Sequence, residues 1–167
     1  MRQSDTRNYT QDSGENLYRR TIYSFWKRMA PPPNMEALNA PSREVCVVRR
    51  ERTNTPLQAL VTLNDPQFVE AARHLATEAI EQTGNDSEAT LQVIASRVLC
   101  RELTTAEAAI LIDSWDEFLD YYQENPQAAS QLLEVGESEA RLELSPTLAA
   151  WTLVCNQVMN LDEAVCK

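Results

Sequence analysis

Apolar residues recur at a spacing of three or four over most of the chain after residue 55. This spacing places them on one side of a helix, so it predicts helices that each bury a single face. A residue able to cap a helix precedes each stretch, and in four cases a proline follows it directly. The predicted starts are Thr55, Asp65, Ser87, Thr104, Asn125 and Ser145.

Three of these helices have especially clear apolar stripes, which we predict to form the core. Thr104 and Glu107 also have the spacing of a capping box at the start of the longest helix. The stripes consist of Phe68, Val69, Ala72, Leu75, Ala76, Ala79 and Ile80, then Ala108, Leu111, Ile112, Trp115, Phe118, Leu119 and Tyr122, then Leu148, Trp151, Val154, Cys155 and Val158.

The lead before residue 53 has a different pattern. Residues 17–29 mix aromatic and β-branched side chains with basic ones, which favours a strand, although a helix fits the same spacing. Three prolines, residues 31–33, stop this element, and residues 44–50 form a short β-branched run that predicts a second strand. The fold class is therefore mainly α, with five to six helices and a short lead that fits two strands.

We expect one domain over residues 17–167, preceded by a disordered tail over residues 1–16. The chain has 167 residues, enough for one domain with a sizeable core. Only three glycines occur, which disfavours a turn-rich β-sandwich. Residues 1–16 are polar and without periodicity, as is typical of disorder.

Charge divides the chain into a basic lead and an acidic body. The net charge is −10, but residues 1–52 hold ten basic and six acidic residues, and the remainder holds five and nineteen. An acidic body argues against a nucleic-acid binder, which needs a basic face. We favour the interpretation that the basic lead lies on acidic helices of its own chain, with an outside anion as the alternative.

The densest polar group in the sequence is our candidate site. An anion could lie at the helix N-terminus that follows Thr55, with help from arginines. We favour the alternative that these arginines pair with acidic residues of later helices and fix the lead to the helices. The group consists of Arg49, Arg50, Arg52, Asn54, Thr55 and Gln58.

Other chemistry has weaker support. Four carboxylates at a spacing of three or four on the longest helix lie opposite its apolar stripe, so we predict a face in contact with water. His74, the only histidine, has no nucleophile or metal ligand near it in sequence, and no Cys-x-x-Cys pair or catalytic motif occurs. We therefore expect no cofactor or metal, and favour a chain that is not an enzyme by itself. The four carboxylates are Asp113, Asp116, Glu117 and Asp120.

No stretch of about twenty apolar residues that could span a bilayer occurs, and the first residues do not form a signal peptide. The chain as written would thus stay in the cytoplasm.

Three segments carry a resemblance to a known family. YRRTIYSFWKRMAPPP, REVCVVRRERTNTPLQALVTLNDPQFVEAARHLA and AAWTLVCNQVMNLDEAV resemble the C-terminal domain of unknown function of large planctomycete proteins, from about residue 17 to the end. The resemblance implies an exported protein whose relatives often carry a haem domain upstream. It also implies that this chain begins inside the family domain and is a fragment. It brings no catalytic residues, because no activity is established for such domains.

Our leading hypothesis is a non-catalytic helical interaction or scaffold module. Its expected partners are the missing upstream domains or another protein chain. The alternative is an auxiliary part of an envelope redox or polysaccharide-degrading assembly that binds an anion or glycan.

Overall fold

The computed structural model describes residues 8–27, 29–49, 53–84, 86–139, 143 and 145–165. The prediction of a mainly α protein is confirmed, and the described residues form no strand. The residues fall into two compact units, 1–61 and 62–167, and helix α2 (Pro56–Asn64) crosses their border. The predicted domain limits, a tail over 1–16 and a domain over 17–167, stay a prediction.

The N-terminal unit contains little regular structure. It has two 3-10 turns, η1 (Gly14–Asn16) and η2 (Thr21–Tyr23), then the short helix α1 (Pro33–Ala37) and the first part of α2. Its contacts include the 2.8 Å hydrogen bond from Lys27 Nζ to the carbonyl of Asn8.

The two strands predicted in the lead are wrong for the described residues. Residues 17–29 include η2 and, beyond it, only an isolated bridge between Lys27 and Ala30, and no strand covers 44–49. Arg43 explains the difference, because its guanidinium donates to the carbonyl oxygens of Thr21 (2.5 Å) and Ser24 (3.3 Å) and lies 5.5 Å from the ring centroid of Trp26. A neighbouring strand would need those carbonyls for its ladder.

The C-terminal unit holds the longer helices, and their bounds follow the sequence signals closely. After the end of α2 come α3 (Pro66–Thr83), α4 (Ser87–Val98), α5 (Thr105–Glu124), α6 (Pro126–Leu133), α7 (Pro146–Met159) and the short α8 (Asp162–Val165). The side chains of Asp65 and Ser145 cap α3 and α7 as predicted, and Thr104 and Glu107 form the predicted capping box of α5.

Two predicted caps are corrected. Helix α4 is capped by Asp86, whose carboxylate accepts from the Ala89 N–H, and Ser87 is its first helical residue. The Asn125 side chain donates to the carbonyl of Tyr121, so it closes α5 instead of capping α6. Cys100 is exposed with a φ of 58°, because it ends α4 in the left-handed conformation and leaves the apolar face.

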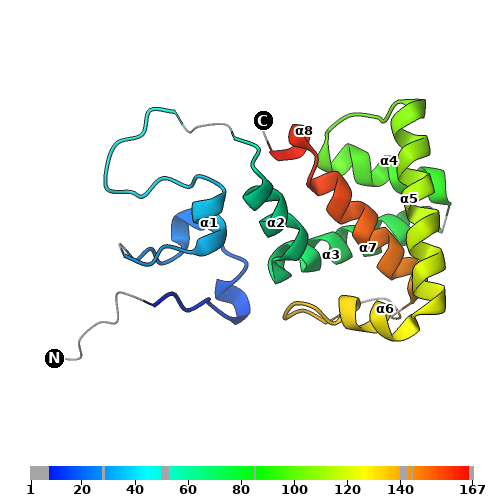
Figure 1. Ribbon diagram of the computed structural model, residues 1–167, viewed down its shortest axis with the longest axis horizontal. Coiled ribbons are helices and arrows are strands. Elements are labelled where there is room, and N and C mark those ends of the chain that lie inside the picture. The colour runs from blue at the N-terminus through cyan, green and yellow to red at the C-terminus, as the bar shows by residue number, and fades with distance from the viewer. Residues whose placement is uncertain are drawn as a thin grey trace. The chain divides into compact units, whose positions relative to one another are not determined.

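Helix α7 is the centre of this unit (Figure 1). It contacts α3, α4, α5, α6 and α8, and its predicted stripe is fully buried. Trp151 is 1% exposed and stacks on Trp115 of α5, with ring centroids 5.1 Å apart. A helix buried on most of its faces is apolar nearly all round, which matches residues 148–155.

We expect Trp151→Ala to lower the free energy of unfolding by about 3–5 kcal/mol, because it leaves a large cavity and removes the ring stack. Urea unfolding followed by circular dichroism measures this change. The control is Ile110→Ala, at a 66% exposed position of α5, which should change the stability by about 0.5 kcal/mol or less. Equal effects of the two substitutions would contradict the central role of α7.

Candidate functional site

The polar group predicted around the start of α2 is only partly within the described residues. Arg50 and Arg52 lie outside them, and Arg49 is exposed. Whether these arginines pair with acidic residues or bind an anion therefore stays a prediction.

Of the remaining members, Asn54 is exposed, and Thr55 and Gln58 are linked to each other by hydrogen bonds at the start of α2. The Gln58 amide oxygen accepts from the Thr55 N–H (3.0 Å), and the Gln58 N–H donates to the Thr55 hydroxyl (3.3 Å). Gln58 Nε2 also donates to the Thr53 hydroxyl, to which Asn39 donates as well. This is a capping box, and it gives the buried Gln58 a structural role in the N-terminal unit.

The carboxylate face of α5 contacts water, as predicted. Asp113, Asp116, Glu117 and Asp120 are all exposed. The described residues contain no group of three His, Cys, Asp or Glu side chains that could hold a metal ion.

A second polar group, which the sequence did not predict, connects α3 to the segment after α6. We call it the Arg73 cluster, and it consists of Glu70, Arg73, His74, Leu133, Gly136, Glu137 and Ser138.

Arg73 is the centre of the Arg73 cluster. It is 2% exposed, and its guanidinium donates to the carbonyl of Leu133 and to both the carbonyl (2.6 Å) and the hydroxyl (3.0 Å) of Ser138. A planar fork with several donors suits such a convergence of acceptors. Arg73 therefore holds residues 133–138 against α3.

Glu70 completes the cluster one turn earlier on α3. Its carboxylate is buried and accepts from the Glu137 N–H at 2.9 Å. Gly136 has a φ of 103°, and a Cβ at this position would collide with the Glu70 carboxylate. The close approach of the segment to α3 therefore requires glycine at 136, because other residues would be strained and obstructed.

His74 and Ser138 have the residue types of a catalytic base and a nucleophile, and they lie next to each other in this cluster. His74 Nε2 lies 2.7 Å from the Ser138 hydroxyl and 3.9 Å from Glu70. A nucleophilic serine needs a base whose second ring nitrogen is oriented by another group. Here the hydroxyl and the carboxylate both approach Nε2, and no described residue contacts Nδ1. The geometry suits a structural hydrogen bond better than nucleophilic catalysis.

The sequence contains one signal that could have revealed part of this cluster. Arg73 lies between the core positions Ala72 and Ala76, and a charged residue beside a buried stripe needs partners. Ser138 is 64 residues from His74, and no local pattern joins them.

Arg101 joins three parts of the C-terminal unit. Its guanidinium binds Glu107 at 2.8 Å and Glu163 of α8 at 2.9 Å. The hydrogen bond from Arg101, together with the capping contacts of Thr104, lowers the pKa of Glu107 to about 2. Arg101 thus fixes α8 to the start of α5.

Burial raises the pKa of the Cys155 thiol well above its usual range, because the side chain lies in the core of α7. A thiol that does not ionise is a poor nucleophile and metal ligand.

None of the described helices is long and apolar enough to cross a membrane.

These observations define an all-helical class of protein without a recognisable catalytic centre among the described residues. The comparison with family models matches residues 1–115 to PSD1, a protein of unknown function (DUF1553), and the chain belongs to this family. Two of the three segments that carry the resemblance lie inside the match, and residues 149–165 lie beyond it. Comparisons with curated proteins and with solved structures found no match.

We expect Arg73→Met to lower the free energy of unfolding by about 2–4 kcal/mol, because it leaves the carbonyls of Leu133 and Ser138 without their donor. The matched control is Arg97→Met, since Arg97 is exposed and only 3.8 Å from an exposed Glu78, a pair worth at most about 1 kcal/mol. Urea unfolding compares the two variants, and a similar small loss in both would show that Arg73 is dispensable.

Glu107 predicts a pH dependence of stability. Its pKa is about 2 in the folded protein and 4.5 as an isolated side chain, so its contribution is full above pH 4.5 and is lost as the pH falls toward 2. Glu107→Gln should therefore lower the thermal midpoint at pH 6, and the difference from the unmodified chain should shrink between pH 4.5 and pH 2. Differential scanning calorimetry checks this, and a difference that is constant with pH would contradict it.

Proposed function

We propose that this protein is a non-catalytic interaction module, and that its N-terminal unit binds another protein domain. The observation that carries the proposal is the exposure of apolar side chains in this unit. Ile22 and Tyr23 are each 71% exposed, Phe25 is 73% exposed and Val48 is 99% exposed. Clustered apolar exposure of this kind is typical of surfaces that bind a partner.

The unit also lacks a core of its own. Among its described residues between 8 and 61, only Pro32 and the polar Gln58 are buried. Since buried apolar surface is the main stabilising contribution to folding, this unit gains little from burial within itself. A partner that covers the apolar side chains would supply the missing contribution.

The contacts of Arg43 bring two exposed segments together. Arg43 donates to the carbonyls of Thr21 and Ser24, so the chain that continues to Val45 and Val48 begins beside η2. We call the exposed apolar residues of these two segments the lead surface. It consists of Ile22, Tyr23, Phe25, Val45, Val47 and Val48.

Charge indicates the kind of partner. Residues 1–52 carry a net charge of +4, and Arg19, Arg20 and Glu44 are exposed close to the lead surface in sequence. A matching partner has an apolar centre and an acidic rim, because complementary charges at a rim steer association. The resemblance makes the domains upstream in longer, exported relatives the first candidates. The planctomycete origin of these relatives and the haem in their upstream domains are part of this proposal.

The test is isothermal titration of the chain with the separately produced upstream region of a longer family member. We expect association that weakens as the salt concentration rises, because the rim charges are screened. The double substitution Ile22→Ser and Phe25→Ser should weaken binding by at least about tenfold, the scale of one or two buried anchors. It should leave the circular dichroism spectrum of the helices unchanged.

The control is Ile110→Ser, which removes an equally exposed apolar side chain from α5. It should leave the affinity unchanged. Failure of the two parts to associate, or equal weakening by both variants, would rule out the lead surface as the binding site.

A further inference from the structure

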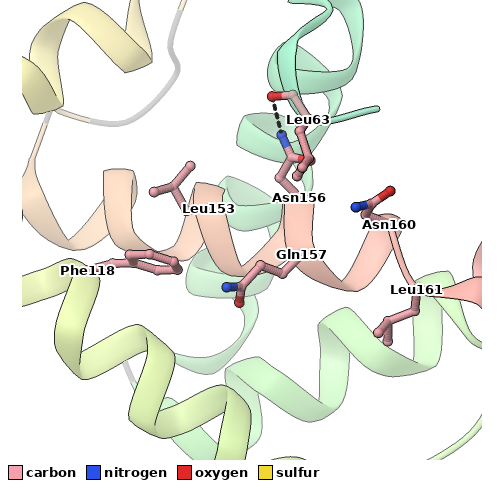
Figure 2. Close-up of a pocket in the computed structure, with 7 residues that line it drawn as sticks. All are labelled: Leu63, Phe118, Leu153, Asn156, Gln157, Asn160 and Leu161. Carbon is pink, nitrogen blue, oxygen red and sulfur yellow. Dashed lines mark hydrogen bonds between the residues drawn. The ribbon is translucent and has the colours of Figure 1, made fainter. Parts of the chain in front are cut away.

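A cavity of about 480 Å³ lies in the C-terminal unit, between α7 and the residues that flank it (Figure 2). Its size is within the range of small-molecule sites. The wall is mainly apolar, with side chains from the end of α2, from α5 and from α7. The lining residues that matter for recognition are Leu63, Phe118, Leu153, Leu161, Asn156 and Gln157.

Two amide oxygens in this wall have no hydrogen-bond partner among the described residues. Asn156 is 2% exposed, and its Oδ1 is unpaired, while the Gln157 Oε1 is buried and unpaired as well. The Asn156 amide is oriented by its other end, through a long hydrogen bond in which Nδ2 donates to the carbonyl of Leu63 at 3.4 Å, as Figure 2 shows. A carbonyl only accepts, so Oδ1 is the free end of this amide.

The amide oxygen of the other polar residue in the wall, Asn160, already has a donor. The Oδ1 atom of Asn160 accepts from the hydroxyl of Thr62 at 2.6 Å. The buried acceptors of this wall that have no donor among the described residues therefore lie on adjacent positions of α7. A buried acceptor without a donor destabilises the fold, and an apolar side chain of the same shape would avoid this cost.

The charge of the wall selects the class of ligand. None of the described residues that line the cavity is Lys, Arg, Asp or Glu, so a charged ligand would lose its hydration without a counter-ion from them. The ligand that fits is neutral, with an apolar body and an N–H or O–H donor. Neither amide oxygen is reached by solvent, but the last torsion of an Asn or Gln side chain is soft, so either amide can turn toward a bound donor.

We propose that this cavity binds a neutral small molecule with an apolar body, and that Asn156 and Gln157 recognise its hydrogen-bond donors. The site is independent of the lead surface, since all of its residues belong to the C-terminal unit. Loss of protein binding at the lead and loss of ligand binding here can therefore be told apart.

The test compares probes that share a body but differ in donors. Benzamide has two N–H donors and N,N-dimethylbenzamide has none, and phenol and anisole differ in the same way. Titrations of the full chain are followed by the side-chain NH₂ resonances of Asn156 and Gln157 in nitrogen-15 correlation spectra. We expect each donor probe to bind about five- to tenfold more tightly than its partner, the scale of one neutral hydrogen bond.

Substitutions then assign the effect to the two amides. Gln157→Met should bring the ratio of the affinities for the donor probe and its donor-free partner toward one. It should also raise the thermal midpoint, because it removes an unpaired buried oxygen. Asn156→Leu should reduce the preference too, although it also removes the bond to Leu63. The control Gln123→Met, at an exposed position of α5, should keep the full preference.

Three results would overturn the proposal. These are no binding of any probe, equal affinity within both probe pairs for the unmodified chain, and a donor preference that survives both Gln157→Met and Asn156→Leu. If Asn156→Leu does not fold, Gln157→Met alone still decides between recognition by the amides and simple partition into an apolar space.

Discussion

The burial of α7 is the constraint on which the C-terminal unit depends. A helix that is covered on most sides needs neighbours on each of them, and α3, α4, α5 and α6 supply these contacts. The stack of Trp115 on Trp151 fixes the distance to α5, and small residues such as Ala149 and Ala150 allow close approach elsewhere. Polar groups on α7 are then forced inside, which is why Asn156 and Thr152 are buried.

Thr152 and Asn156 show two solutions to the same problem. The Thr152 hydroxyl donates to the carbonyl of Leu148 one turn earlier, so its polar group is satisfied within the helix. The Asn156 amide is too large for this solution and satisfies only one end. Thr152 therefore has its hydrogen bond within the helix, whereas the Asn156 amide oxygen has no donor among the described residues.

Much of the C-terminal unit could be predicted from the sequence because its signals are local. Asp65, Thr104 and Ser145 cap the helices that follow them, and the stripe of α7 is buried as the spacing indicates. The lead could not be predicted in this way. Its β-branched and aromatic residues favour strands, but the conformation depends on where the side chain of Arg43 finds acceptors, about twenty residues earlier.

The sites were harder to predict than the fold for the same reason. Arg73 contacts Leu133 and Ser138 across 60 and 65 residues, and Asn156 contacts Leu63 across 93 residues. The residue types were visible in the sequence, but nothing local set their partners. The group around Thr55 could be predicted because its members lie close together in the sequence, and Thr55 and Gln58 form a capping box.

The contact between Gly136 and Glu70 has a consequence for how the sequence can change during evolution. A side chain at 136 and a glutamate at 70 compete for one volume, so a side chain at 136 requires a change at 70. A relative with alanine at the first position should carry a shorter residue at the second. It should then also lose the acceptor for the Glu137 N–H, so the drift of one glycine would loosen the whole segment after α6.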